Sequence, residues 1–257
     1  MQTTSLKQRL AAGETALGSW ITLANPGLAE IMARSGFDWL AVDLEHSVIT
    51  IREAEELIRV IGLCGVSPLV RLSWNDHVQI KRVMDAGAHG VIVPMVNSPE
   101  EAAAAVSAVH YPPRGTRGVG LGRASGYGTA FAAYKDWLAE SALVITQVEH
   151  IRAVENLEGI LDTPGVDGFL VGPYDLSGSL GRPGDFGHPD FLAAMQRIQD
   201  VAAAKGALAG IHVVEPDLAE LAQRLGQGYR FVAYSLDIRM LDAACRQGVA
   251  AARERIA

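Results

Sequence analysis

Residues 143–149, LVITQVE, and residues 168–177, GFLVGPYDLS, are the two stretches that indicate how this chain folds. Each begins as a short apolar run typical of a buried strand, and each leads to a carboxylate, Glu149 or Asp175. Parallel barrels gather polar residues where the carboxyl ends of their strands meet. We therefore expect the two acids to lie together and to form a site for a hard metal ion.

Strand-like and helix-like segments alternate along the whole chain. Helical segments such as 51–63 and 188–206 begin near a capping residue or an early proline, and several end at glycine. Eight candidate strands are 16–23, 39–44, 68–72, 90–96, 143–149, 168–172, 207–213 and 229–234. This α/β pattern predicts a closed (β/α)8 TIM barrel that forms a single domain over residues 1–257. An open doubly wound sheet is the alternative, but no GxGxxG or Walker-type loop is present, so we expect no nucleotide.

Composition excludes several classes of function. The chain has 257 residues and a net charge of -7, and its basic residues are scattered, so neither nucleic acid nor a membrane is an expected partner. No apolar stretch approaches the roughly 18 residues that span a bilayer, and the first 14 residues lack the apolar run of a signal peptide. Cys64 and Cys245 are interpreted as reduced thiols, which predicts a cytoplasmic protein.

One segment, 111–127, is rich in Gly, Arg and Pro and separates the fourth and fifth strands. A connection of this length in a compact barrel is often functional or interfacial. A solvated loop without a role is an equally good interpretation.

Polar side chains at strand ends supply the candidate chemistry. Gln147 and Glu149 are two residues apart, so they face the same way along a strand. Arg71 lies in a buried strand and needs an anionic partner, for which a substrate oxygen would serve. His46 follows a strand end and is the candidate base. Taken singly, Glu149 could simply pair with Arg71, and His46 could be scaffolding; their coincidence with Asp175 favours a site.

The residue types near the strand ends indicate which metal binds and how the substrate carbonyl is activated. Two carboxylates without a Cys or His ligand pair favour Mg²⁺ or Mn²⁺ over structural zinc. Water and a chelating 2-oxo acid would complete the coordination. The four lysines, Lys7, Lys81, Lys135 and Lys205, all fall in predicted helices, so no Schiff-base lysine is expected. No GxSxG elbow supports serine hydrolysis.

The chain resembles the HpcH/HpaI family of metal-dependent (class II) 2-oxo-acid aldolases, which includes 4-hydroxy-2-oxoheptanedioate aldolase and 2-dehydro-3-deoxy-sugar-acid aldolases. The resemblance covers nearly the whole length and is most specific in Q-x-E and G-P-x-D-L-S. Its carriers are residues 18–47, 68–72, 81–96, 111–120, 147–150 and 166–181. It implies a barrel of the phosphoenolpyruvate/pyruvate type and reversible cleavage of a 4-hydroxy-2-oxo acid to pyruvate and an aldehyde, such as succinic semialdehyde, tartronic semialdehyde or lactaldehyde.

The resemblance also implies roles for individual residues. Glu149 and Asp175 match the ligands of Mg²⁺, Mn²⁺ or Co²⁺, and Gln147 matches a pyruvate-binding side chain. Arg71 matches the residue that stabilises the enolate, and His46 the base. Asp85, otherwise an ordinary helix residue, matches the acid that raises the basicity of the base. The backbone of Gly172, Pro173, Tyr174 and Asp175 matches the turn that binds the substrate carboxylate.

Some features depart from the family pattern or leave alternatives. Tyr174 stands where a small residue is expected, and the segments IHVVEPD and AYSLDIRM are less typical, so the aldehyde half is open. The family implies a homo-hexamer, a trimer of dimers with the last helix exchanged between subunits, in which loop 114–128 could complete a neighbour's site. A CoA-thioester lyase, an oxaloacetate decarboxylase and a non-catalytic metabolite-binding barrel are the alternative functions.

Overall fold

The chain folds into a barrel of eight short strands, which are rich in apolar residues. The computed structural model describes residues 4–256, in which the strands close into a parallel barrel in the order β1 to β8. The strands are β1 Ala16–Ile21, β2 Trp39–Asp43, β3 Ser67–Arg71, β4 Gly90–Val93, β5 Leu143–Val148, β6 Gly168–Val171, β7 Ala209–Val213 and β8 Phe231–Leu236. The predicted (β/α)8 barrel and its eight strands are confirmed. Strand β4 ends three residues before the predicted Val96, because Met95 adopts a left-handed backbone with φ of 53°.

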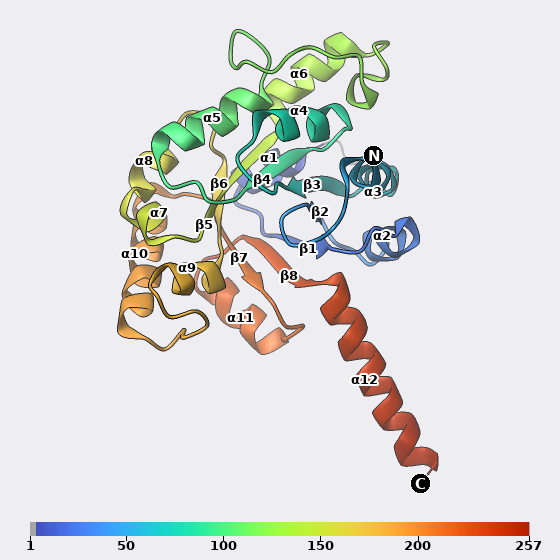
Figure 1. Ribbon diagram of the computed structural model, residues 1–257, viewed down its shortest axis with the longest axis vertical. Helices are drawn as coiled ribbons and strands as arrows, with labels where there is room; N and C mark the ends of the chain where they lie inside the picture. Colours follow the sequence, from blue (N-terminus) through green and yellow to red (C-terminus); the bar gives the residue numbers. More distant parts are fainter. Residues whose placement is uncertain (1–3, 257) are drawn as a thin grey trace.

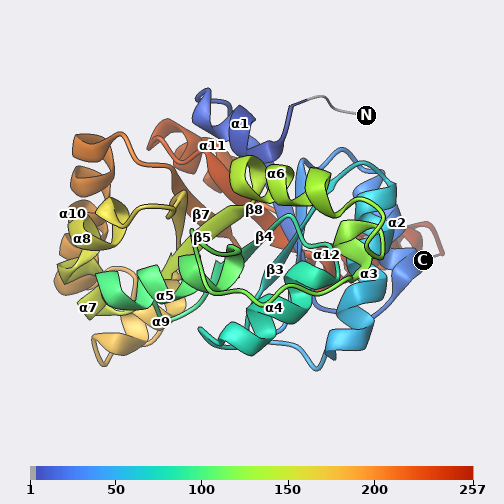
Figure 2. The same cartoon turned by 90° about the horizontal axis from the view of Figure 1, so that it is seen from above.

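Helices surround the strands on the outside (Figures 1 and 2). They are α1 Leu6–Ala11, α2 Pro26–Ala33, α3 Ile51–Leu63, α4 His77–Asp85, α5 Pro99–Val109, α6 Phe131–Ser141, α7 Ile151–Glu155, α8 Leu157–Asp162, α9 Pro173–Ser179, α10 Pro189–Lys205, α11 Leu218–Gly226 and α12 Asp237–Ile256, with a 3₁₀ turn at Arg123–Ser125. Helix α3 begins and ends as predicted, since Thr50 and Glu53 form a capping box at its start. All four lysines lie in helices, as predicted.

The core has two parts, which follow from the two-residue period of the strands. Outward side chains such as Val42 and Val144 pack under the helices. Inward side chains fill the barrel, where Trp39 stacks on Phe231 with ring centroids 4.3 Å apart. Helix α1 adds Leu6 to this inner cluster. The interior is therefore packed, and polar side chains are left for the ends of the strands.

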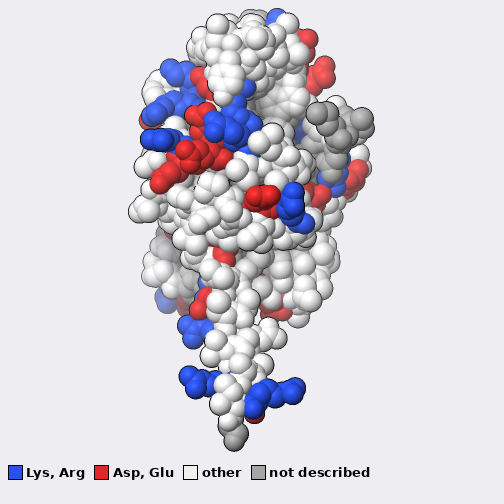
Figure 3. Space-filling model, turned by 90° about the vertical axis from the view of Figure 1, so that its right-hand side faces the viewer, with Lys and Arg blue, Asp and Glu red and all other residues white. Residues whose placement is uncertain are grey.

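Helix α12 extends away from the barrel instead of packing beside it (Figure 1). Asp237 is its only buried residue among those described, while Leu241 and Val249 are exposed. The space-filling view shows cationic side chains near the tip of this helix, whose last turn holds Arg253 and Arg255 (Figure 3). No helix within residues 4–256 has the length and apolar character needed to cross a membrane.

We predict that Gly18→Ala lowers the free energy of unfolding by about 1–3 kcal/mol because the barrel interior has no room for a methyl group. A Cβ atom at Gly18 would lie 2.0 Å from the ring of Trp39, which is fully buried. Urea titration measures the change. The control is Gly226→Ala at the end of α11, where no heavy atom lies within 4 Å, so stability should be unchanged or slightly higher. Equal behaviour of the two variants would contradict the packing described.

We predict that the stability contributed by two buried histidines is lost as the pH falls from about 6.5 towards 4. Burial, aided by the charge of Arg123, lowers the pKa of His89 to about 4, and burial likewise lowers the pKa of His110 to about 4. At these two positions the unfolded chain binds more protons in this window, so their contribution to stability is complete above pH 6.5 and declines below it, by at most about 3 kcal/mol for each histidine. Urea titrations at pH 4.5 and 7.5 measure the free energy of unfolding of the unaltered protein and of His89→Gln. The variant should lose less stability on acidification than the unaltered protein, and equal changes in the two proteins would count against this cause.

Candidate functional site

A cavity of about 620 Å³, here called the mouth cavity, opens at the carboxyl ends of the strands. The inward residues of β5 are Leu143 and Ile145, so the same alternation directs Gln147 and Glu149 inward as well. Gln147, Arg71, His46 and Asp175 line the cavity. Of the side chains predicted from strand ends, the structure brings together all those on β2, β3, β5 and β6.

Glu149 is buried and held by two donors. Its Oε1 accepts a hydrogen bond of 2.6 Å from the backbone N–H of Met95, and its other oxygen accepts one from the Gln147 amide. Burial raises the pKa of Glu149, although both donors act in the opposite direction. A carboxylate buried in this way needs a nearby positive charge to offset the free energy of keeping it ionised.

Gly172 lies against this carboxylate at the end of β6. A Cβ atom at position 172 would lie 2.9 Å from both Cβ and Oε2 of Glu149 and 3.5 Å from the Gln147 amide nitrogen. Any side chain would therefore displace Glu149. The glycine of the GPYDLS motif allows β6 to approach the acid.

Arg71 forms a two-point ion pair with Asp43 across neighbouring strands. The register pairs the two residues directly, and Nε and Nη2 of Arg71 lie 2.8 and 2.6 Å from the Asp43 oxygens. The guanidinium also lies over the ring of Trp20, 4.3 Å from its centroid. Burial alone would raise the pKa of Asp43, but the hydrogen bonds from Arg71 hold it below its ordinary value. Arg71 is thus oriented, and within residues 4–256 no hydrogen bond uses its Nη1.

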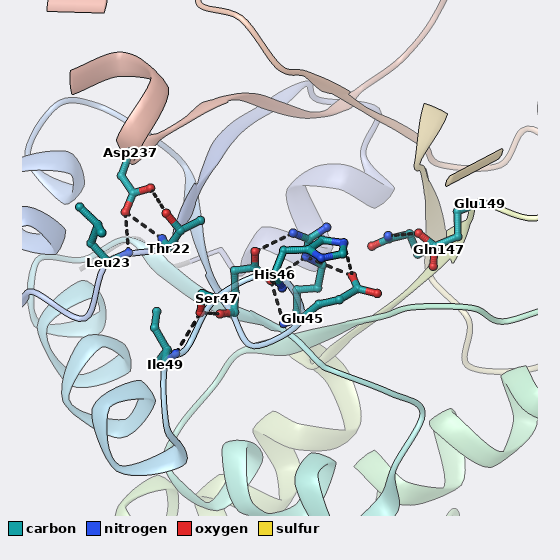
Figure 4. Close-up of polar contacts among 11 residues, drawn as sticks. Thr22, Leu23, Glu45, His46, Ser47, Ile49, Gln147, Glu149 and Asp237 are labelled. Carbon is teal, nitrogen blue, oxygen red and sulfur yellow. Dashed lines mark hydrogen bonds and ion pairs between the residues drawn. The ribbon is translucent and has the colours of Figure 1, made fainter. Parts of the chain in front are cut away.

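Glu45 and His46 follow β2 on the side of the mouth that faces Gln147 and Glu149 (Figure 4). Burial first, and then the negative charge of Glu149, raise the pKa of Glu45 to about 7. Nε of Arg71 lies 3.4 Å from its Oε2, and Nε2 of the His46 imidazole lies 3.9 Å from the same oxygen. The His46 side chain is 60% exposed, so it can reach a substrate in the cavity.

Asp175 lies in the first turn of α9 and lines the mouth cavity. Its charge and that of Glu149 both act on Glu45, so three acids share one region with Arg71 as their nearby cation. Tyr174 is 57% exposed, and its ring meets the edge of Phe186 with centroids 4.9 Å apart. Its bulk lies at the margin of the cavity and does not fill it.

Asp85 is the predicted site residue that the structure does not bring to the mouth. It ends α4, and its carboxylate lies 2.6 Å from Nη2 of Arg117, which belongs to the long 111–127 loop. Arg117 is buried and also hydrogen-bonds the Tyr134 hydroxyl at 3.0 Å. The loop is therefore anchored by a buried cation, and Asp85 lies at that anchor and not beside His46 of its own chain.

The donor set fits a hard divalent cation. Oxygen atoms from Glu149 and Asp175 are the ligands that Mg²⁺ and Mn²⁺ prefer. Buried Oε2 of Glu45 and Oε1 of Gln147 have no hydrogen-bond partner in the described part of the chain, and the acids lack a compensating charge that an ion would supply. No group of three His, Cys, Asp or Glu side chains in residues 4–256 forms a complete metal site, so water or substrate would have to complete the coordination.

Asp43, Glu45 and His212 lie at the site but are not among the residues predicted from the sequence. Each of them could have been found from the two-residue period of its strand. Asp43 and Glu45 show the same two-residue spacing at a strand end as Gln147 and Glu149. His212 lies four residues after the inward residue Leu208, so it shares the same period. A further acid, Asp237, is buried where β8 ends.

Asp237 closes the seam of the barrel between β8 and β1 (Figure 4). It accepts hydrogen bonds from the Thr22 backbone and hydroxyl at 2.8 and 2.6 Å and from the Leu23 backbone at 2.9 Å. Thr22 and Leu23 line the mouth cavity, so this carboxylate fixes one side of its rim.

Residues 16–244 match the family model described as HpcH/HpaI aldolase/citrate lyase. The chain is 37% identical to a hydroxypyruvate/pyruvate aldolase of Cupriavidus necator over 97% of this chain and 92% of that one. It is 39% identical to a 2-keto-3-deoxy-L-rhamnonate aldolase of Klebsiella pneumoniae over 90% and 86% of the two chains. A solved HpcH/HpaI aldolase/citrate lyase family protein from Burkholderia cenocepacia superposes with a TM-score of 0.92 at 37% identity, covering 98% of this chain and 100% of the other.

We predict that Asp43→Asn lowers the free energy of unfolding by about 3 kcal/mol, because it leaves the buried Arg71 charge without its partner. The Asp43 side chain is 1% exposed and that of Arg71 13%. Glu158→Gln is the matched control, because the Glu158–Arg197 pair is 43% and 51% exposed and should change stability by less than about 1 kcal/mol. Urea titration compares the two variants. Equal losses would show that Asp43 and Arg71 do not form the pair described.

Proposed function

Because the chain belongs to the HpcH/HpaI aldolase/citrate lyase family, we propose how its mouth cavity carries out the family's aldol chemistry. The protein is an aldolase, a carbon–carbon lyase that reversibly cleaves a 2-oxo acid to pyruvate and an aldehyde. The observation that carries the proposed site is the proximity of Glu149, Asp175 and Glu45, whose charges act on one another, beside the mouth cavity that Asp175 and Arg71 line.

A divalent ion, Mg²⁺, Mn²⁺ or Co²⁺, is the proposed cofactor, with Glu149 and Asp175 as its protein ligands. When bound, it would supply Lewis-acid polarisation of the 2-oxo group. The Gln147 amide, which hydrogen-bonds Glu149, is the proposed ligand of the pyruvate half. The turn from Gly172 to Asp175 is proposed to take the substrate carboxylate; Gly172, Pro173, Tyr174 and Asp175 all line the cavity.

The reaction moves one proton and breaks one bond. His46 is the proposed base, which removes the proton of the C4 hydroxyl. As the C4 carbonyl forms, the C3–C4 bond breaks and its electron pair shifts towards the C2 oxygen. Arg71 is oriented by Asp43 and Trp20, so its Nη1 can donate to that oxygen without reorganisation. His46 then returns this proton, directly or through water, to C3, which gives pyruvate.

Assembly is part of the proposal. Helix α12 leaves its own barrel with exposed apolar residues, and α11 has no buried residue, which supports a homo-hexamer in which α12 packs on a neighbouring copy. Asp85 lies away from the mouth of its own chain, so we propose that it serves His46 of such a neighbour. Both cysteines are free, which fits a cytoplasmic enzyme.

We predict that EDTA abolishes pyruvate release from 4-hydroxy-2-oxo acids and that Mg²⁺, Mn²⁺ or Co²⁺ restores it. A lactate dehydrogenase-coupled assay would screen substrates that yield succinic semialdehyde, tartronic semialdehyde or lactaldehyde. Glu149→Gln should lower metal-stimulated turnover by about 100-fold or more, since a ligand loses its charge. Glu155→Gln, at an exposed position on α7, is the matched control. Metal-stimulated turnover that persists in Glu149→Gln would rule out this ligand assignment.

A further inference from the structure

A cavity of about 440 Å³, here called the α6 cavity, lies away from the mouth. It is lined by residues 87–89, which lead into the amino end of β4, by residues 123 and 124 of the long 111–127 loop, and by the beginning and middle of α6. None of these residues lines the mouth cavity. The volume falls in the range of small-molecule sites, roughly 300–1,000 Å³.

Arg123 gives the α6 cavity a positive charge that the protein does not balance. It is the only Lys, Arg, Asp or Glu residue in the lining. Its Nη1 donates to the backbone carbonyl of Ala86 at 2.9 Å, and within residues 4–256 its guanidinium forms no ion pair with a carboxylate. Burial first, and then the charge of Arg59, lower the pKa of Arg123. Glu55, which acts on Arg123 from a greater distance, is already paired with Arg59 at 3.0 Å. A half-buried cation in this position favours an anionic ligand.

Aromatic rings line the same cavity. The half-buried Trp137 packs on His89 with ring centroids 5.0 Å apart, and on Tyr134 with centroids 5.8 Å apart and planes 17° from parallel. The other lining residues of α6 and of the turn before it include Ala130 and Ala133, whose small side chains leave room beside these rings. The cavity therefore offers flat apolar surface to a planar ligand.

His89 adds a neutral hydrogen-bond donor next to the cation. It is close enough to Arg123 for that charge to contribute, after burial, to lowering the pKa of His89 to about 4. The imidazole is therefore neutral at pH 7 and carries one N–H donor. In the described part of the chain its ring forms no hydrogen bond. A carboxylate beside both residues can accept from the planar guanidinium and from the imidazole.

We propose that the α6 cavity is a second ligand site, which binds a planar organic anion, namely a carboxylate attached to an aromatic ring. The carboxylate accepts hydrogen bonds from Arg123 and His89, and the ring lies against Trp137. The chain has 29 Asp and Glu residues and a net charge of -7, yet none of these acids lines the α6 cavity, so the lining does not repel an anion. Because the cavity lies at the amino end of β4, binding there requires no aldolase activity.

Fluorine NMR titrations in metal-free buffer test this site with three probes. The probe 4-fluorobenzoate has both the ring and the carboxylate, 4-fluorobenzyl alcohol lacks the charge, and trifluoroacetate lacks the ring. We expect 4-fluorobenzoate to bind about tenfold or more tightly than either of the others, because each of them loses one of the two interactions. Similar affinities for the three probes, or no saturable binding of 4-fluorobenzoate, would overturn the proposal.

Two pairs of variants locate the bound probe. Arg123→Met should weaken the binding of 4-fluorobenzoate by about tenfold or more, whereas Arg82→Met removes the same charge at an exposed position of α4 outside the cavity and should leave the affinity unchanged. Ala133→Trp fills the cavity and should abolish binding. Ala132→Trp, at the neighbouring exposed position of α6 that does not line the cavity, is its matched control. Equal affinities within either pair would contradict the site.

The second pair keeps the test decisive if Arg123→Met also loosens the loop, because both tryptophan variants retain Arg123.

Hydrogen exchange with 4-fluorobenzoate present separates the α6 cavity from the mouth, where Arg71 is a second cation that a carboxylate can meet. Arg123 holds the carbonyl of Ala86, and a Cβ atom at Gly122 would lie 2.9 Å from the backbone oxygen of Asp85, so the loop and the end of α4 are in close contact at the cavity. We expect the probe to slow exchange in residues 122–126 and to leave residues 172–177 unchanged. Protection of residues 172–177 alone would place the probe in the mouth and overturn the proposal.

Discussion

The two-residue alternation of strands in a closed parallel barrel is the constraint on which the rest of the structure depends. Every second residue of a strand points into the barrel, and Trp39, Ala41, Leu69 and Ile145 fill its interior with apolar side chains. The last inward position of a strand is the one that meets the mouth. Polar residues at these positions are brought together by the barrel geometry itself.

Charge balance then determines how these residues are arranged. The Arg71 guanidinium is paired with Asp43 on the adjacent strand, so its charge is already partly compensated and does not neutralise Glu45, Glu149 and Asp175. The mouth therefore combines a rigid cation with an excess of carboxylate. That combination is suited to a bound divalent ion and to negative charge that develops on a substrate oxygen.

The sequence predicts the barrel, its eight strands and the group of Gln147, Glu149, Arg71 and Asp175, because all of these follow from strand ends and residue period. It does not reveal that Arg71 pairs with Asp43, since this depends on the register between β2 and β3. The place of His212 in the lining of the mouth cavity depends on the pairing of β7 with β8. Asp85 lies beyond prediction from period alone, because it belongs to a helix in the outer layer.

The contact between Gly172 and Glu149 has an evolutionary consequence. Because a side chain at position 172 would collide with the carboxylate, that position is closed to variation as long as the chemistry is kept. Tyr174 and His212, only a short distance away along the rim, carry no such restriction. Natural variation or engineering can therefore change the rim of the mouth cavity while the residues proposed to break the carbon–carbon bond stay the same.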